Sequence, residues 1–418
     1  MAKMMNPLNS KQFSRLRDAI KWSNTQLDYP REQRVQSIEQ FVGSHHTEGG
    51  FDRPVPVNML KLAVDIFVRM LAPKSPRGMI ETRQRDKRAL ANTFELALNE
   101  IPRDIGYDLT QRRLITEALF SLGILRIGLE TVDRVMGENY GKPFADLITI
   151  DDYFCDMTAR HFDELRYEGC DYWVDFDVLK DDPDLRKKAK DGLGPDEYES
   201  VGPMGQRRAE SIIGMNSPKT LTKQVWVREV FMHKENLLVT YGIKSEELLK
   251  VMDWDGPEHS PYYKLGFTFV PGNLFPLPPV AVWRDLHELG NALFRKLGAQ
   301  ADSQKSVLGF RGGDDGSVQA FQKAKDGDGI TWTGADPQKL TAGGVEAATL
   351  AFYLQVRDLN SYFAGNLDSL GGLAPMTQTV GQDKLLGEAA GAQMRDMADN
   401  VIKFNREVFE AFAWYEWH

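Results

Sequence analysis

The residues best suited to chemistry lie between positions 151 and 164. Asp151 and Asp152 follow a predicted strand, and His161, Asp163 and Glu164 come later in the same stretch. Carboxylates and an imidazole gathered in this way could hold a divalent metal ion for hydrolysis. The alternative is that Asp151 caps a helix or a turn while the other side chains are solvated surface. The spacing matches no recognised metal-ligand motif, which favours this second interpretation.

Other polar motifs also indicate loops rather than catalytic or metal sites. The adjacent pair His45-His46 would point its side chains apart on a helix or a strand. The acidic stretch 326–329 lacks the other ligands of a calcium loop, and 312–317 lacks the lysine of a phosphate-binding loop. Cys155 and Cys170 match no zinc or redox spacing. We therefore expect no catalytic residue, no metal site and no cofactor, in a protein that is not an enzyme.

The composition is typical of a soluble globular protein. Its 418 residues are 42% hydrophobic and 27% charged. The 51 basic and 60 acidic residues give a net charge of -9, which argues against a monomer that binds nucleic acid through a general basic surface. The first residues lack an apolar signal core, and no apolar run reaches the length of about 18 that a membrane span requires. We expect a soluble intracellular protein with free thiols and no membrane span.

Up to residue 266, predicted helices and strands are mixed, which indicates the α+β class. Helical spacing of apolar residues predicts helices over 8–42, 57–71, 87–99 and 110–122. β-Branched and alternating apolar residues predict strands over 79–82, 123–132, 147–150 and 168–178, a hairpin over 224–232 and 236–243, and then a helical turn at 245–250. The polar stretch 181–219 is expected to be a mobile insertion.

The remainder of the chain is mainly helical. Four prolines within 267–279 require an extended entry. A predicted helix over 280–303 is followed by a small α/β piece, with strands at 307–310 and 330–333 and a helix at 317–325. Helices over 345–363 and 379–417 flank a glycine-rich loop whose apolar side chains, Leu367, Leu370 and Leu373, exceed what a solvated linker needs. At about 1.5 Å per residue the last helix would span roughly 55 Å, which favours packing in a large assembly.

The order of these parts, together with several short motifs, resembles the portal proteins of tailed double-stranded DNA bacteriophages, also called head-to-tail connectors. The motifs are Asp285-Leu-His-Glu-Leu-Gly-Asn291, Gly329-Ile330 and Met376-Thr-Gln-Thr379, with Asn58-Met-Leu-Lys-Leu-Ala-Val-Asp and Leu122-Gly-Ile-Leu-Arg-Ile-Gly-Leu upstream. None of them is a catalytic signature. The resemblance is one of architecture, and it covers nearly the whole chain.

The resemblance implies a portal fold that assembles into a ring, usually of about twelve subunits. Its parts would be a wing at 1–277, a stem helix at 278–304, a clip at 305–344, a second stem helix at 345–364, a tunnel loop at 365–376 and a long wing helix at 377–418. Many relatives continue into a helical crown, which here is absent or truncated.

The resemblance also implies partners and a location. The ring would sit at one capsid vertex of the virion after assembly in the host cytoplasm, in contact with major capsid and scaffolding proteins. It would dock the terminase for genome packaging and later a tail or head-completion adaptor. Double-stranded DNA would pass non-specifically through its channel during packaging and ejection.

Three groups of residues become candidate sites under this resemblance. The tunnel loop would present Asn366, Leu367, Asp368, Ser369, Leu370 and Leu373 to DNA. The stem would line the channel with Arg284, Glu288, Arg295, Lys296 and Arg357. The clip would dock terminase and adaptor through Arg311, Asp314, Asp315, Lys323, Lys325, Asp326 and Asp328.

The charge of the second half of the chain suits a conduit. Residues 345–418 carry ten acidic and five basic side chains, and 280–344 carry eight of each. A channel wall with this near-neutral or acidic charge would not hold DNA phosphates as a basic lining does. The loop leucines could form an apolar constriction near DNA, or they could pack against a neighbouring subunit. Two other functions stay open: a scaffolding or adaptor protein without a pore, and a metal-dependent hydrolase that uses Asp151, Asp152 and His161.

Overall fold

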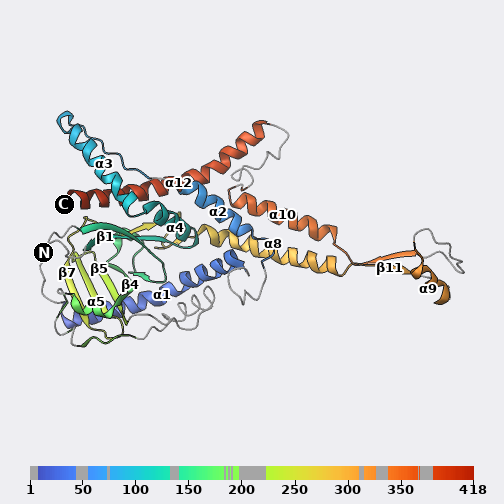
Figure 1. The fold of residues 1–418 in the computed structure, drawn as a ribbon, viewed down its shortest axis with the longest axis horizontal. Helices are drawn as coiled ribbons and strands as arrows, with labels where there is room; N and C mark the ends of the chain where they lie inside the picture. Colours follow the sequence, from blue (N-terminus) through green and yellow to red (C-terminus); the bar gives the residue numbers. More distant parts are fainter. Residues whose placement is uncertain are drawn as a thin grey trace. The chain divides into compact units, whose positions relative to one another are not determined.

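The chain forms two compact units, one of Met1–Asp285 with Ser361–His418 and the other of Leu286–Asn360. The computed structural model describes residues 8–43, 55–72, 76–131, 141–182, 185–186, 189, 192–196, 223–309, 315–325, 338–365, 367 and 380–418. Each unit combines helices with antiparallel strands, so the α+β class is confirmed (Figure 1). Within these described ranges no helix is both long and apolar enough to cross a membrane.

Four helices begin the first unit: α1 (Ser10–Val42), α2 (Met59–Leu71), α3 (Arg88–Asp104) and α4 (Tyr107–Phe120). A capping box between Asn9 and Gln12 fixes the start of α1. Asn58 caps α2 by accepting a hydrogen bond from the Lys61 N–H at 2.9 Å, and its amide donates to the Phe41 carbonyl at 2.7 Å. One side chain therefore ties the end of α1 to the start of α2.

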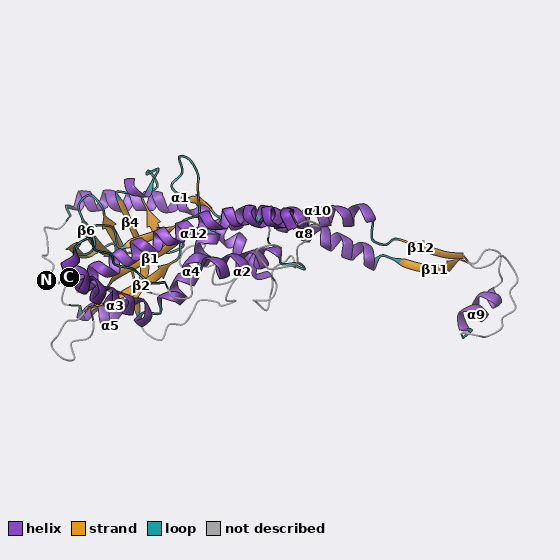
Figure 2. Cartoon of the chain, turned by 90° about the horizontal axis from the view of Figure 1, so that it is seen from above, coloured by secondary structure: helices purple, strands orange, loops and turns teal. Residues whose placement is uncertain are grey.

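Two antiparallel sheets follow, drawn as orange arrows in Figure 2. The smaller has the order β2-β1-β8 and consists of β1 (Gly123–Thr131), β2 (Gly141–Ile148) and β8 (Tyr262–Leu265). The larger has the order β3-β4-β5-β6-β7 and consists of β3 (Tyr153–Cys155), β4 (Tyr167–Asp175), β5 (Gln224–Met232), β6 (Leu237–Gly242) and β7 (Leu248–Asp253). Short elements complete the unit: η2 (Arg85–Lys87), η3 (Phe162–Glu164), α5 (Phe176–Asp181) and the pair β9 (Thr268–Phe269) and β10 (Pro276–Leu277).

The main core of this unit lies between α2, α4, β1, β8 and the long helix α12 (Val380–Trp417). Residues buried from α12 recur every three or four positions: Met394, Met397, Val401, Phe404, Val408 and Phe412. Tyr107 is fully buried, with its ring edge-on to Phe412, and its hydroxyl donates to Asn405 at 2.9 Å. The helical period read from the sequence therefore marks the buried face of α12.

The second unit is built from the C-terminal part of α8 (Pro279–Asp302), a hairpin and most of α10 (Ala347–Phe363). The hairpin pairs β11 (Lys305–Gly309) with β12 (Gln338–Ala342), and α9 (Asp315–Lys323) lies between them in the chain. Figure 2 shows α8 and α10 alongside one another. Gly343, at φ +77°, joins β12 to α10, and a Cβ there would lie 2.8 Å from the Ser303 carbonyl oxygen. Only glycine combines this backbone conformation with so close an approach.

Most predicted elements are confirmed, with four differences. Residues 79–82 are extended but belong to no sheet, and the predicted turn at 245–250 overlaps the start of β7. The strand expected at 147–150 is the end of β2, which begins at Gly141, and the strand expected at 168–178 ends at Asp175, where α5 begins. The strand expected at 330–333 lies outside the described residues and is not tested. In the first two cases local propensity misled, because strand pairing depends on a distant partner.

The expected insertion at 181–219 is only partly described. Residues 197–222 lie outside the described part of the chain. Leu185 and Ala189 are buried, and they pack in a cluster with Val225, Val227 and Leu249. These two residues therefore help to cover one side of the larger sheet.

Candidate functional site

The predicted tunnel loop lies mostly outside the described residues, including Asn366, Asp368, Ser369, Leu370 and Leu373. Leu367 is described, and it is buried in the main core of the first unit at 4% exposure, together with Ala364. In this structure Leu367 therefore packs inside its own chain.

The stem residues differ from one another in their surroundings. Arg284 donates to the Gln33 side chain at 2.8 Å and to the Gln33 carbonyl at 3.3 Å, which fastens the start of α8 to α1. Glu288 and Lys296 are exposed on α8, and Arg295 is half-buried. On α10, the exposed Arg357 pairs with Asp358 at 2.9 Å. Arg284 thus has a clear structural role within its own chain.

The clip residues that the structure describes are all exposed. Asp315 begins α9, Lys323 ends it, and Lys325 follows. Their charged side chains are therefore accessible on the second unit. Four others lie outside the described residues: Arg311, Asp314, Asp326 and Asp328.

The feature that the sequence analysis missed is the apolar surface of α10. Its buried face carries Thr349, Tyr353, Val356 and Asn360, and the Tyr353 ring lies 5.4 Å from that of Phe294 on α8. Four large apolar residues, each between 39% and 47% exposed, lie outside this face: Leu350, Phe352, Leu354 and Leu359.

These four residues form two separate stripes. At about 100° per residue, Leu350 and Leu354 lie to one side of the buried face, and Phe352 and Leu359 lie to the other. We call them the first flank (Leu350, Leu354) and the second flank (Phe352, Leu359). In the sequence of α10, apolar residues occupy more of the helix circumference than one buried face needs. A search for a single apolar stripe overlooks this excess.

His287 on α8 was also overlooked as a candidate. Its side chain is fully buried, and burial lowers its pKa from 6.5 to about 4. The Asn291 amide donates to the His287 carbonyl at 3.0 Å and lies 3.2 Å from the imidazole Nε2. The imidazole is therefore neutral at pH 7 and adds no charge to the stem.

Within the stretch 151–164, Asp151 and Asp152 have structural partners. Arg34 of α1 pairs with Asp151 at 3.0 Å and with Glu117 at 2.9 Å, and Asp152 accepts from the Thr149 hydroxyl at 2.9 Å. His161, Asp163 and Glu164 are exposed on and beside η3. Among the described residues, no three or more His, Cys, Asp or Glu side chains come together as a metal site.

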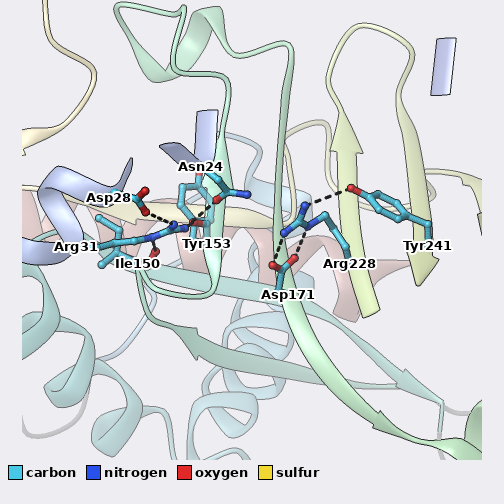
Figure 3. A network of polar contacts seen from close by, with 8 residues as sticks. All are labelled: Asn24, Asp28, Arg31, Ile150, Tyr153, Asp171, Arg228 and Tyr241. Atoms are coloured by element: carbon cyan, nitrogen blue, oxygen red, sulfur yellow. Dashed lines mark hydrogen bonds and ion pairs between the residues drawn. The ribbon is translucent and has the colours of Figure 1, made fainter. Parts of the chain in front are cut away.

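A network of arginines holds the turn that carries Asp151 and Asp152. Figure 3 shows Arg31 of α1 reaching this turn, where it donates to the Ile150 carbonyl at 3.0 Å and the Tyr153 carbonyl at 2.9 Å. In the same view Arg228 of β5 pairs in a bidentate manner with Asp171 of β4, at 2.6 Å for each bond. The bonds of Arg31 tie α1 to this turn, and the Arg228–Asp171 pair links β4 to β5.

Glu168 of β4 is a fully buried carboxylate with a strongly lowered pKa. It accepts hydrogen bonds from the Tyr153 hydroxyl and Lys264 at 2.6 Å each, and it contacts His233 at 2.9 Å and the Ser260 hydroxyl. Burial alone would raise its pKa, but Lys264 and His233 outweigh burial and lower the pKa to about 2. Because its partners come from separate segments of the chain, no local motif marked this residue.

No model of a known protein family matches the chain, and no curated protein matches it either.

Proposed function

We propose that this chain is the subunit of a phage portal, a ring at one capsid vertex through which the genome is packaged and ejected. The observation that carries the proposal is the pair of apolar flanks on α10, in a helix pair that leads into a hairpin. The order of stem helix, clip hairpin, second stem helix and long wing helix supports the same assignment. The terminase and the tail or head-completion adaptor would dock on the exposed charges of Asp315, Lys323 and Lys325.

Two flanks on opposite sides of one helix favour head-to-tail association. In such an interface one surface of a subunit meets a different surface of the next, and the contacts close into a ring when the rotation allows. A two-fold dimer would need only one self-complementary surface. Burying the first flank of one copy against the second flank of its neighbour would cover both stripes in every subunit.

The charges on the helix pair suit a channel. Glu288, Lys296 and Arg357 are the exposed candidates for its wall, and they mix both signs. A mixed wall does not release counterions from DNA as a basic wall would, so the duplex can slide. The neutral His287 fits the same picture, since it adds no fixed positive charge.

The proposal is tested by breaking each flank separately in the full chain. One double variant carries Leu350→Glu with Leu354→Glu, and the other carries Phe352→Glu with Leu359→Glu. Neither should form rings alone, since each lacks one half of every interface. Ala351→Glu adds a single charge at an exposed position between the flanks and serves as the control.

Mixing the two double variants gives the sharper result. Each still has the flank that the other lost, so one interface can form, and a heterodimer of about 95 kDa is expected from chains of 47.3 kDa. Mass photometry measures this species directly. Rings formed by either double variant, or loss of rings in Ala351→Glu, would contradict the proposed interface.

A further inference from the structure

We propose that residues 76–83 and α12 form a docking groove for an extended acidic peptide of another protein, which adds to residues 76–83 as a β-strand. This inference does not depend on the portal assignment. The sequence predicts a strand at 79–82, but this stretch pairs with no strand in the described part of the structure.

Residues 76–83 alternate between half-buried and exposed, as a strand does. Gly78 and Ile80 are half-buried, whereas Met79 is 79% exposed. A Cβ on Gly78 would lie 2.8 Å from the Phe409 ring and 3.1 Å from Leu98, so this backbone is pressed onto α12 and α3.

Side chains of α3 take the place of a neighbouring strand along one edge of this segment. The Gly78 N–H donates to Asn99 Oδ1 at 2.9 Å, and Asn99 Nδ2 donates back to the Gly78 carbonyl at 2.9 Å. Glu95 accepts from the Ile80 N–H at 3.0 Å. The two bonds between Gly78 and Asn99 reproduce those of a hydrogen-bonded pair in an antiparallel ladder.

The opposite edge has no partner within the described part of the chain. In an extended backbone, successive residues direct their N–H and C=O groups to alternate edges. Since Gly78 and Ile80 face α3, the groups of Met79 and Glu81 face the other way, and neither residue has a backbone hydrogen bond among the described residues. Such an edge is a template for a further strand.

A groove lies beside this segment, with a volume of about 600 Å³. Residues 76–80 line one side, and the other is formed by Leu98 of α3 and by α12, through Ile402, Asn405, Arg406, Phe409, Glu410 and Ala413. A strand added to a free edge gains affinity from main-chain bonds, and pockets for alternate side chains give specificity. An aliphatic side chain of the added strand would contact Leu98, Ile402 and Phe409.

The charge along residues 77–88, which run from the groove to the start of α3, favours an acidic occupant. Residues 77–88 contain five basic and two acidic side chains, although the whole chain has a net charge of -9. The basic residues are all exposed, and within the described chain no ion pair involves them: Arg77, Arg83, Arg85, Lys87 and Arg88. Acidic residues flanking the aliphatic positions of a peptide would complement them.

The test selects peptides against the full-length chain. A randomised library of peptides about nine residues long, the length of a strand, is enriched on immobilised protein, and the enriched peptides are labelled with fluorescein for polarisation measurements. We expect aliphatic residues at alternate positions with acidic residues around them. N-methylation of alternate backbone nitrogens should abolish binding while leaving the side chains unchanged. No enrichment, or equal binding by the N-methylated peptides, would overturn the proposal.

Two variants at one position separate the backbone from the side chain. Met79→Pro removes the free N–H, and loss of a hydrogen bond that leaves its partner unsatisfied should weaken peptide binding about tenfold. Met79→Ala keeps the N–H and should change binding by no more than about twofold. Equal affinities of the two variants would contradict strand addition. Tight binding of a labelled DNA duplex that displaces the peptide would assign the basic patch to nucleic acid instead.

Discussion

Replacing Glu168 with glutamine should destabilise the first unit by about 3 kcal/mol at pH 7. The carboxylate is fully buried, and its pKa lies at about 2 instead of 4.5. Each pKa unit corresponds to about 1.4 kcal/mol, so the shift of about 2.5 units gives roughly 3 kcal/mol in favour of the folded state. Glutamine keeps the shape of the side chain but leaves the charge of Lys264, whose side chain is 10% exposed, without its counterion.

The effect should depend on pH in a direction fixed by the sign of the shift. Because the folded-state pKa of Glu168 is depressed, its contribution is complete above about pH 4.5 and is lost as the pH falls toward 2. The difference between the wild type and Glu168→Gln should therefore shrink over this interval. Urea unfolding followed by tryptophan fluorescence, repeated at several pH values, measures this difference.

A second variant separates the charge from the hydrogen bonds. Adding Lys264→Met to Glu168→Gln removes the unpaired cation and should recover part of the lost stability, which a double-mutant cycle quantifies. A loss below about 0.5 kcal/mol for Glu168→Gln, or a loss that stays constant down to pH 2.5, would refute the reasoning.

Three further predictions concern other parts of the structure. Gln111 is 1% exposed, and its amide nitrogen and oxygen have no hydrogen-bond partner among the described residues. Because an unsatisfied buried amide is costly, Gln111→Met should raise the free energy of unfolding, measured by urea titration, by about 1–2 kcal/mol. Gly343→Ala should place a Cβ against the Ser303 carbonyl oxygen, at a residue whose φ of +77° disfavours any side chain. The resulting strain should speed local opening of the β11–β12 hairpin, which hydrogen exchange measures. Asp151→Asn should lower the melting temperature, because it breaks the ion pair with the buried Arg34. As a control, Asp163→Asn at an exposed position should leave the melting temperature unchanged. Equal effects of the two substitutions would contradict the structural role of Asp151.

The sequence predicted the elements whose signal is local. The helices α2 and α12 follow from apolar spacing, because a helix that buries one face repeats it every three or four residues. The β5–β6 hairpin follows from alternation around a short turn. The segment 79–82 has the same alternation, but a strand also needs a partner, and here α3 supplies side chains in its place.

The surroundings of the candidate sites could not be predicted in the same way. Asp151 is held by Arg34, and Glu168 by Lys264, so each site joins segments far apart in the chain. Spacing within one motif carries no information on such pairs. The sequence shows that the four flank residues of α10 are apolar, but it does not show that they are exposed. Hydrophobicity alone does not tell which positions a single chain buries.

Assembly of the chain into a ring is tested directly by mass photometry of the purified protein, together with negative-stain imaging of the same sample. Twelve copies of a 47.3 kDa chain would give a species of about 570 kDa, and the images should show rings with a central hole. A monomer or a two-fold dimer that persists over the whole accessible concentration range would contradict the proposed assembly.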